Sequence, residues 1–431
     1  MRIALIALGS RGDVQPYVAL GAGLHRAGHM VRIITHENYA GLVQAQGLEF
    51  WPVSGNVQDV AETEEMRALV EKGNFLAISR EMAKQAQQAT LLWAQEGLDG
   101  CRGMDTLIAG IGGLFVGLAL AEKLDTAFIQ AHVTPFTPTA DFPGALAPSS
   151  LPRLGGAVNR LSHHLTRQMM WQPFRSADAS MRQQVLGLAP ASFWGPFGDD
   201  RLRRSPTLYG FSPAVVPKPA DWGADVHVTG YWVLEAEAEW NPPAELVNFL
   251  EQGPPPVFIG FGSMTQRKPQ ETADLVMRAL AQTKLRGVIQ SGWANLRRGE
   301  VSSPVSSPVS SPGPADVIFI DSIPHTWLFP RMAAVVHHGG AGATAAGLRA
   351  GVPSVIIPFF GDQPFWGGRV QELGVGPAPI PRSQLTADRL TQTIESATSD
   401  QAMRKRAAEL GARIRREDGI GAAVAAIQNR R

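Results

Sequence analysis

Cysteine is almost absent from this sequence. Among 431 residues there is a single cysteine, Cys101, so the chain can form no internal disulfide and no cysteine-based metal cluster. An excess of charge is also lacking, because 39 Lys and Arg residues balance 38 Asp and Glu residues. A net charge of +1 gives no general argument for a nucleic-acid partner, and we expect none.

A long hydrophobic run is missing too. The most apolar stretch, residues 106–121, has 16 residues and four glycines, whereas a membrane-spanning helix needs about 20 apolar residues. Its GIGG segment resembles a dinucleotide fingerprint only weakly, because Phe115 occupies the place of the third glycine. A strand followed by a helix is the better interpretation. The apolar run in the first residues, MRIALIALGSRGD, is too short for a secretory signal. We therefore expect a soluble cytoplasmic protein.

The sequence does contain enough apolar residues for two domains. Hydrophobic residues make up 44% of the chain, and two domains of about 200 residues each fit its length. Residues 2–8 predict a strand, 14–27 a helix and 30–35 a second strand, and the alternation restarts at residue 257. This order is typical of an α/β fold with doubly wound sheets, in which ligands bind beyond the carboxyl ends of the strands.

The most informative stretch is residues 335–368, VVHHGGAGATAAGLRAGVPSVIIPFFGDQPFWGG. It predicts a buried strand, a glycine-rich turn, an Ala-rich helix and a second strand. Such a turn lets backbone N–H groups and the positive end of the helix dipole face phosphate groups. His337 and His338 add donors, and Asp362 and Gln363 suit sugar hydroxyls. Together these residues predict a nucleotide-sugar site.

This stretch resembles the donor-binding signature of nucleotide-sugar glycosyltransferases of the GT-B type. It is most similar to that of the sterol 3-beta-glucosyltransferases, whose relatives include the glycopeptide-antibiotic glycosyltransferases. GSRGDVQPYVALG (residues 9–21) and SIPHTWLFPR (residues 322–331) carry the same resemblance, so it extends over both halves of the chain. The resemblance implies an α/β fold with two Rossmann-like doubly wound domains that face each other across a cleft.

The expected domain boundaries follow from composition and from this resemblance. We expect an N-terminal acceptor-binding domain over residues 1–235, a linker over 236–256 and a nucleotide-sugar-binding domain over 257–405. The resemblance implies that a C-terminal helix, residues 406–431, returns to the N-terminal domain. A Ser-Pro-Val repeat between residues 300 and 314 cannot form a core and is expected to be a disordered loop without catalytic duty.

Asp13 is the candidate general base. It lies in the turn after the first strand, where a carboxylate can accept the proton of an acceptor hydroxyl as the new bond forms. On the residues alone, a role as helix N-cap is an equal alternative. The resemblance favours catalysis, because glycopeptide-type relatives with GSRGDV carry their base at this Asp. His132 is a weaker rival or an orienting partner.

The donor site is expected to hold UDP-glucose without a metal cofactor. No Asp-x-Asp motif occurs in the chain, so amide, histidine and serine groups are expected to stabilise the departing diphosphate. Ser322, Ile323 and His325 match the uracil-binding segment of the family, and Trp293 is either a stacking partner for uracil or a core residue. The other donor-binding candidates are Ser10, Arg11, Gly12, Ser263, His338, Gly340, Ala341, Gly342, Ala343, Thr344, Asp362 and Gln363.

The N-terminal half is expected to bind the acceptor. Phe115, Phe136 and Trp171 are the acceptor-binding candidates. Residues 151–210 contain eight arginines against three aspartates, together with exposed-looking Met169, Met170, Trp171 and Trp194. A helical segment here, residues 161–174, is interpreted either as a lid over the acceptor or as a patch that contacts an anionic membrane surface.

We therefore predict an inverting glycosyltransferase that adds glucose from UDP-glucose to a hydroxyl of a bulky apolar acceptor and gives a beta-glucoside. A sterol or triterpenoid is the expected acceptor, and an antibiotic, polyketide or flavonoid aglycone is the alternative. From another class, a UDP-sugar epimerase or a non-catalytic UDP-sugar-binding protein remains open. The expected partners are a UDP-sugar and an apolar small molecule, and peripheral membrane contact is a further alternative.

Overall fold

The computed structural model describes residues 1–55, 63, 65–66, 68–69, 75–147, 155–235, 240–262, 264, 269–291 and 316–429. The chain divides into two units. Unit 1 comprises the described parts of Met1–Ala61, Phe75–Leu234 and Glu417–Arg431, and unit 2 comprises those of Glu62–Asn74 and Glu235–Arg416. The Ser-Pro-Val repeat, Ser263 and Trp293 lie outside the described residues.

Unit 1 is built on a parallel sheet whose described strands follow the order β3-β2-β1-β4-β5-β6-β7. In the centre of the sheet, Ile3 of β1 lies beside Val31 of β2 and Thr106 of β4. The strands are β1 (Arg2–Ile6), β2 (Met30–His36), β3 (Glu49–Val53), β4 (Thr106–Ala109), β5 (Ala127–His132), β6 (Thr207–Tyr209) and β7 (Val226–Val228).

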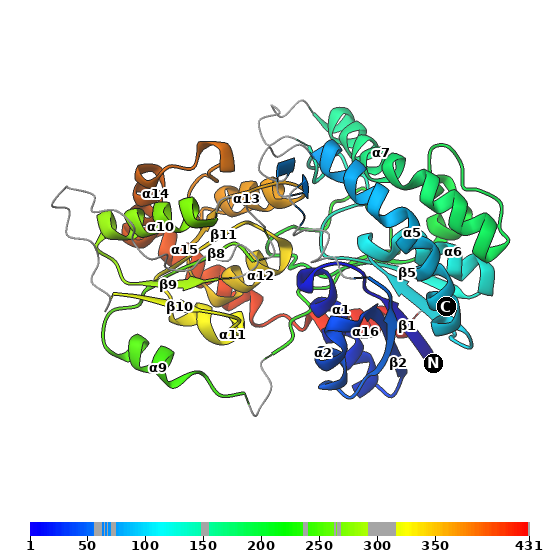
Figure 1. Cartoon of the computed structure of the whole chain (residues 1–431), viewed down its shortest axis with the longest axis horizontal. Coiled ribbons are helices and arrows are strands. Elements are labelled where there is room, and N and C mark those ends of the chain that lie inside the picture. The colour runs from blue at the N-terminus through cyan, green and yellow to red at the C-terminus, as the bar shows by residue number, and fades with distance from the viewer. Residues whose placement is uncertain are drawn as a thin grey trace. The chain divides into compact units, whose positions relative to one another are not determined.

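Helices cover both faces of this sheet (Figure 1). Successive side chains of β1 point to opposite faces, as in any strand. Ile3 and Leu5 therefore enter one core, and Ala4 and Ile6 enter the other. Because both faces are buried, β1 has a continuous apolar sequence rather than an alternating one. The helices are α1 (Arg11–Arg26), α2 (Ala40–Gln44), α5 (Phe75–Cys101), α6 (Leu114–Leu124), α7 (Gly156–Met181), α8 (Asp200–Arg204) and α16 (Gly419–Gln428).

The last described helix, α16, belongs to unit 1 and lies beside α1 (Figure 1). Gly23 of α1 makes this contact possible, because a Cβ at that position would lie 2.1 Å from Cγ2 of Ile420. The sequence predicts one returning helix over residues 406–431. The structure has two helices there instead: α15 (Gln401–Ile414) belongs to unit 2, and the chain passes to unit 1 before α16 begins.

Unit 2 is built on a second parallel sheet with the order β10-β9-β8-β11-β12. Its strands are β8 (Val257–Gly260), β9 (Gly287–Gln290), β10 (Val317–Ile320), β11 (Ala334–His337) and β12 (Ser354–Ile356). Its helices are α9 (Ala244–Glu251), α10 (Pro269–Thr283), α11 (His325–Leu328), α12 (Ala341–Ala350), α13 (Gln363–Glu372), α14 (Ala387–Ser399) and α15. The two doubly wound parallel sheets that the strand-helix alternation predicts are thereby confirmed.

The segment expected to be a linker contains helix α9. Leu246 and Phe249 of this helix are buried in the same core as Phe258 of β8. Their spacing of three residues places both side chains on one face of the helix. Residues 244–251 are therefore an integral part of unit 2 and not a free connection.

Candidate active site

Each sheet has a point where the strand order reverses, and open α/β sheets bind ligands beyond the carboxyl ends of the strands at this point. In unit 1 the reversal lies between β1 and β4, so the turn before α1 and the turn before α6 share it. In unit 2 it lies between β8 and β11, so the turn at Gly262 and the turn at residues 338–340 share it. The candidate residues predicted from the sequence concentrate in these turns.

In unit 1, the carboxylate of Asp13 is held by the start of its own helix. Its Oδ2 accepts hydrogen bonds from the backbone N–H and the hydroxyl of Ser10, both at 2.8 Å. This arrangement is a capping box, in which the side chain of the third helical residue accepts a hydrogen bond from the backbone N–H of the residue just before the helix. Gly9 allows it, because a Cβ there would lie 2.5 Å from the same oxygen. Asp13 therefore caps α1, and its carboxylate is exposed.

The other two residues predicted to face the donor from this turn are Arg11 and Gly12. They are the first two residues of α1, and both are exposed. The guanidinium Nε of Arg11 donates to Oε1 of Gln15 at 3.0 Å, one turn further along the helix. Arg11, Gly12 and the N-cap Ser10 thus lie in the same turn as Asp13, as their adjacent positions in the sequence predict.

Tyr17 links the Asp13 turn to β5 and was missed by the sequence reasoning. Its hydroxyl donates to the carbonyl of Ala131 at 2.6 Å, and its ring is fully buried. Burial and the charge of Asp13 both raise the pKa of Tyr17. Gly110 makes room for this bond, because a Cβ there would lie 1.6 Å from the Tyr17 oxygen. The available sequence signal is the spacing of four residues between Asp13 and Tyr17, which places them on one helix face.

The GIGG segment serves packing in this structure. A Cβ at Gly112 would lie 2.1 Å from the carbonyl oxygen of Leu8, and one at Gly113 would lie 2.9 Å from Cγ2 of Ile6. The turn before α6 therefore approaches β1 closely, and side chains at these positions would collide with it. This close approach accounts for the glycines without a bound dinucleotide.

His132, the rival to Asp13, is buried at the end of β5. Its side chain is 1% exposed, and neither ring nitrogen has a hydrogen-bond partner in the described part of the chain. Burial, together with the nearby charge of Arg167, lowers the pKa of His132 to about 3. The ring is therefore neutral at pH 7. It lies 5.4 Å from the ring of Phe136 and 5.9 Å from that of Tyr209.

The three acceptor-binding candidates lie in one aromatic cluster. The ring of Phe115 is 5.0 Å from that of Trp171 and 6.2 Å from that of Phe197, and Phe197 is 5.9 Å from Phe136. Phe115 and Phe197 keep part of their surface, whereas Phe136 and Trp171 are buried. The expectation of an exposed Trp171 is wrong, because its indole is fully covered and its Nε1 donates to the carbonyl of Phe193.

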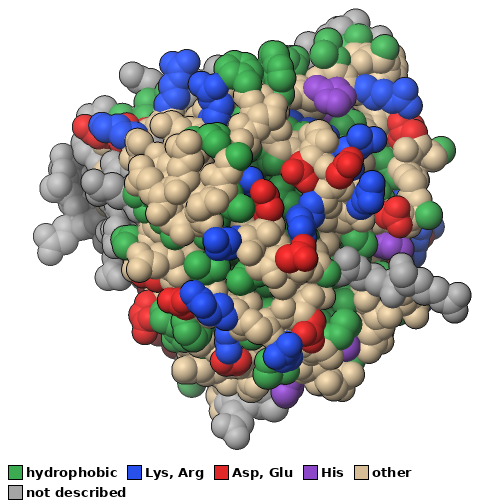
Figure 2. Space-filling view, turned by 90° about the vertical axis from the view of Figure 1, so that its right-hand side faces the viewer, with side chains coloured by type: hydrophobic (Ala, Val, Ile, Leu, Met, Phe, Trp, Pro, Cys, Tyr) green, Lys and Arg blue, Asp and Glu red, His purple; other side chains and the backbone are tan. Residues whose placement is uncertain are grey.

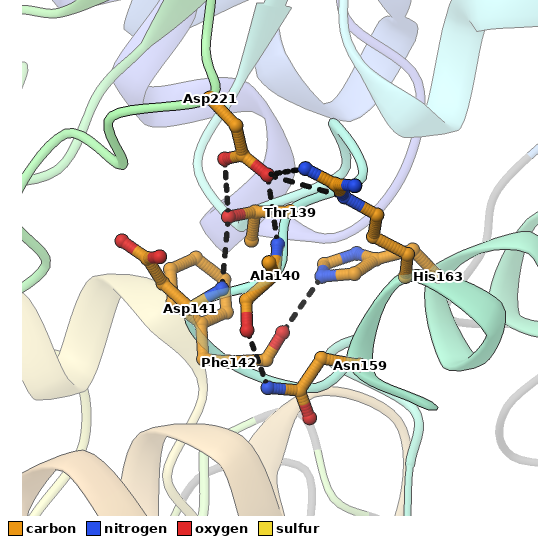
Figure 3. A network of polar contacts seen from close by, with 8 residues as sticks. Thr139, Ala140, Asp141, Phe142, Asn159, His163 and Asp221 are labelled. Atoms are coloured by element: carbon orange, nitrogen blue, oxygen red, sulfur yellow. Dashed lines mark hydrogen bonds and ion pairs between the residues drawn. The ribbon is translucent and has the colours of Figure 1, made fainter. Parts of the chain in front are cut away.

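The first half of α7 is fixed by a polar network with the loop after β5 (Figure 3). The carboxylate of Asp221 accepts from the hydroxyl of Thr139 at 2.7 Å and from the backbone N–H of Ala140 at 2.9 Å. Asn159 donates to the carbonyl of Ala140 at 2.7 Å. Arg160 pairs with Asp221 at 3.0 Å. An arginine that the composition suggested for a membrane patch is thus engaged in an ion pair.

Exposed apolar residues do occur on and near α7. Leu161 is 57% exposed, Leu165 is 56% exposed and Trp194 is 67% exposed. Figure 2 shows acidic and basic side chains interspersed over the face that it presents, with hydrophobic side chains gathered at its upper edge. No described helix is long and apolar enough to cross a membrane.

In unit 2, the two histidines of the glycine-rich turn have different environments. The buried His337 points inward, and its Nδ1 accepts a hydrogen bond from the backbone N–H of Gly339 at 3.1 Å. The ring of His338 lies between two glycines: a Cβ at Gly340 would be 2.4 Å from its Nε2, and one at Gly262 would be 3.0 Å from its Cε1. Burial lowers the pKa of His338 to about 4. His338 is therefore neutral at pH 7 and lies at the strand-order reversal.

Helix α12 begins directly after this turn, with Gly340 as its N-cap. Thr344 makes the first intrahelical bond, from its N–H to the carbonyl of Gly340. The N–H groups of Ala341, Gly342 and Ala343 precede it and have no intrahelical acceptor, as at any helix start. These three residues are at least partly exposed, whereas the hydroxyl of Thr344 is buried. The backbone of the first turn, rather than the Thr344 side chain, is thus available to an anion.

The loop after β12 holds Asp362 and Gln363, the predicted sugar contacts. Gln363 is buried, and its Oε1 accepts from the backbone N–H groups of Phe359 and Phe360 at 2.7 and 3.2 Å. Its Nε2 donates to the sulfur of Met264 at 3.3 Å. Oδ2 of Asp362 accepts from Nε1 of Trp366 at 2.9 Å. Gln363 therefore shapes the loop, and its predicted contact with the sugar stays a prediction.

The predicted uracil-binding segment follows the carboxyl end of β10. Ser322 is exposed, Ile323 is buried, and His325 begins α11. The ring of His325 stacks on that of Phe329 at 4.2 Å. Burial, followed by interactions with His338 and His325, lowers the pKa of His337, so this segment lies near the glycine-rich turn. Within the part of the chain that the structure describes, no group of three or more His, Cys, Asp or Glu side chains could hold a metal ion.

Comparisons with known proteins address the family and the fold of the chain. The family model described as the glycosyltransferase family 28 N-terminal domain matches residues 3–143. The model described as erythromycin biosynthesis protein CIII-like, C-terminal domain, matches residues 305–418. Among solved structures, glycosyltransferase VinC in complex with dTDP has a TM-score of 0.64 at 19% identity over 99% of both chains. SnogD from Streptomyces nogalater has a TM-score of 0.60 at 18% identity over 99% of both chains.

Whole-chain similarity extends to proteins named sterol 3-beta-glucosyltransferase. One from Arabidopsis thaliana is 37% identical over 437 residues, which cover 98% of this chain and 67% of the relative. Another from Cryptococcus neoformans is 37% identical over 445 residues, which cover 99% of this chain and 27% of the relative. This chain therefore spans two thirds of the length of the plant relative and about a quarter of that of the fungal one.

The two parallel sheets and the solved neighbours define the fold as GT-B, a glycosyltransferase architecture. The sequence comparisons then narrow the assignment. The chain belongs to the glycosyltransferase family that includes the sterol 3-beta-glucosyltransferases. The resemblance seen in the three sequence segments is thereby confirmed.

Proposed function

We propose that this protein is an inverting glycosyltransferase that adds glucose from UDP-glucose to a hydroxyl of a bulky apolar acceptor, with a sterol or triterpenoid as the leading acceptor. The observation that carries the proposal is the similarity over 98% of the chain to a sterol 3-beta-glucosyltransferase. The turn of unit 2 supports the donor part, because His338 and the first N–H groups of α12 offer a neutral, anion-attracting site.

Asp13 is the proposed general base. The acceptor oxygen attacks the anomeric carbon, the bond to the diphosphate breaks, and the hydroxyl proton passes to the Asp13 carboxylate. Attack from the face opposite the leaving group inverts the anomeric configuration. The exposure of the Asp13 carboxylate supports this role, whereas the burial of His132 makes that ring the poorer candidate.

The departing UDP is proposed to be stabilised without a metal ion. The N–H groups of Ala341, Gly342 and Ala343 lie at the positive end of the α12 dipole, where developing negative charge is stabilised. His338 adds a neutral donor. We expect full activity in EDTA, and a complete loss that Mg²⁺ or Mn²⁺ restores would contradict this account.

The acceptor is the part that needs a direct test. UDP release from UDP-glucose should be measured with sterols, flavonoids and macrolides side by side, and sterols should give the highest kcat/KM. A higher kcat/KM for a macrolide would favour the antibiotic alternative. Binding of UDP-glucose without UDP release from any acceptor would favour a non-catalytic protein. Because sterol-like acceptors reside in membranes, peripheral membrane contact through α7 is part of the proposal.

A further inference from the structure

Arg167 of α7 carries a positive charge, and no acidic side chain among the described residues forms an ion pair with it. Its guanidinium carbon lies 5.4 Å from the ring centroid of Phe136 and 5.2 Å from that of Phe197. Its Nε is buried and has no hydrogen-bond partner in the described residues. Arg160, two turns earlier on the same helix, has Asp221 as a partner. Within the described part of the chain, Arg167 forms no ion pair of this kind.

Three described titratable groups interact with Arg167, and all three are neutral at pH 7. Burial lowers the pKa of His132 to about 3 and that of His163 to about 4, and the charge of Arg167 adds to both shifts. Burial raises the pKa of Tyr209, whose hydroxyl donates to Thr137. These groups therefore supply no negative charge. Contacts with aromatic faces offset only part of the free energy needed to remove a cation from water.

A second observation points to a missing ligand group at the same place. The ring of His132 is 1% exposed, neither of its nitrogens has a hydrogen-bond partner among the residues that the structure describes, and it packs against Phe136, one of the rings beside Arg167. Buried polar atoms are nearly always hydrogen-bonded in folded proteins. An unpaired guanidinium next to an unpaired imidazole is the arrangement expected around a bound oxygen group.

The position of Arg167 is set before any ligand arrives. Its helix is anchored one to two turns earlier by Asn159, Arg160 and His163, whose Nε2 lies 3.0 Å from the carbonyl oxygen of Phe142 (Figure 3). The rings of Phe136 and Phe197 fix the guanidinium itself. Arg167 keeps part of its surface, so it is reachable despite its buried Nε.

We propose that Arg167 binds a carboxylate of the acceptor, so that the acceptors of this protein include hydroxylated apolar ring systems that also carry an acidic group. A guanidinium group matches a carboxylate through two parallel hydrogen bonds, and the surrounding rings match an apolar skeleton. This inference rests on the proposed glycosyltransferase function. A sterol with one hydroxyl would leave the charge of Arg167 unpaired.

The test compares two acceptors that differ at one carboxyl group, which is ionised in one and methylated in the other: a 3-hydroxysteroid with a side-chain carboxylic acid, and its methyl ester. The wild-type protein should use the acid with a kcat/KM higher by about tenfold or more, as expected for a charge-assisted bidentate contact. In Arg167→Met the ratio should fall to about one. The matched control is Arg175→Met, on the exposed part of the same helix beside Phe193, where the ratio should stay at the wild-type value.

Equal kcat/KM values for acid and ester in the wild-type protein would overturn the inference, even if Arg167→Met fails to fold. Retention of the preference in a folded Arg167→Met protein would overturn it as well. A further arm measures UDP binding without acceptor: if Arg167→Met weakens UDP, the anion at this site is the diphosphate of the donor and the inference fails.

Calorimetric binding of the acid and the ester without donor separates this inference from the proposed function. Arg167-dependent preference for the acid, in a protein that transfers glucose to neither compound, would support the binding site while contradicting the proposed reaction. Transfer to both compounds without any preference would support the reaction and overturn the binding site.

Discussion

The backbone N–H of Gly339 donates a hydrogen bond of 3.1 Å to Nδ1 of His337. Because Nδ1 accepts, the neutral His337 ring carries its proton on Nε2. This bond closes the turn that leads into α12, and it involves a buried ring. His337 is thus the residue that holds the turn, while His338 is the residue that the turn presents.

We expect His337→Phe to lower both stability and UDP affinity. The change keeps an aromatic ring but leaves the Gly339 N–H without its acceptor, and an unsatisfied buried donor costs about 1–3 kcal/mol. His338→Ala should lower UDP affinity with little change in the thermal midpoint. Calorimetric UDP binding and thermal unfolding of both variants distinguish the two roles. Wild-type UDP affinity in a folded His337→Phe protein would contradict the positioning role.

Asp13→Asn should lower turnover by about 10²–10⁴-fold, because it removes the proton acceptor while keeping the shape. UDP affinity should barely change. Since Asp13 also closes the capping box, thermal unfolding must accompany the kinetics, with Ser10→Ala as the matched control for the cap. Near-normal turnover in Asp13→Asn would remove Asp13 from the mechanism.

The loop after β12 allows the two sugar candidates to be separated. Asp362→Asn keeps a side-chain oxygen that can accept from Trp366 but removes the charge, so it should raise KM for UDP-glucose or lower kcat without weakening UDP. Gln363→Ala should additionally lower the thermal midpoint, because two backbone N–H groups lose their acceptor. An equal loss of UDP and UDP-glucose affinity in Asp362→Asn would show that this loop does not contact the sugar.

His132 gives the protein a pH dependence of known sign. Its pKa is about 3 in the folded chain, against about 6.5 in the unfolded chain. The unfolded chain therefore binds a proton at a higher pH than the folded chain. The contribution of neutral His132 to the free energy of unfolding is complete above about pH 6.5 and is lost as the pH falls. At pH 5 the loss is about 2 kcal/mol.

We expect the thermal midpoint to fall less between pH 7.5 and pH 5 in His132→Phe than in the wild-type protein. This variant loses no hydrogen bond, because neither ring nitrogen has a partner in the described residues. Identical pH profiles for His132→Phe and the wild-type protein would contradict a buried neutral ring.

If α7 contacts a membrane, apolar residues should contribute more than arginines. Arg160 is paired with Asp221, and Arg167 lies among aromatic rings, whereas Leu161, Leu165 and Trp194 are all more than half exposed. We expect co-sedimentation with anionic vesicles that falls about tenfold in a triple Gln variant of these three residues. Absence of vesicle binding at low salt would leave α7 as a lid only.

The sequence was a good guide where a single local pattern decides the structure. The strand predicted at the start of residues 106–121 lies in place as β4 (Thr106–Ala109), because a buried parallel strand is a short apolar run with turn residues around it. The glycine-rich turn and the start of α12 were predicted as well, because glycines followed by an Ala-rich segment are also a local pattern.

Elements that depend on distant contacts were not predictable in this way. The sequence predicts a helical segment containing residues 161–174, and helix α7 extends beyond it at both ends, from Gly156 to Met181. Trp171 is buried where its indole donates to the carbonyl of Phe193, and Arg160 is paired with Asp221, which lies 61 residues further along the chain. Local patterns carry no information about such partners. Asp13, as cap and as candidate base, is a case where the residues themselves left two interpretations, as they also did for Trp293 and for residues 161–174.

The contact between α16 and α1 affects how the chain can fold as it is synthesised. The ribosome completes α1 early, but Ile420 and Ile427 of α16 emerge only after residues 235–416. Until then the surface of α1 beside Gly23 is not covered by α16. Unit 1 therefore keeps an exposed apolar surface while unit 2 is being synthesised. Completion of unit 1 therefore requires α1 to contact α16 across the whole of residues 235–416, and the nascent protein depends on late residues to complete the half that is made first.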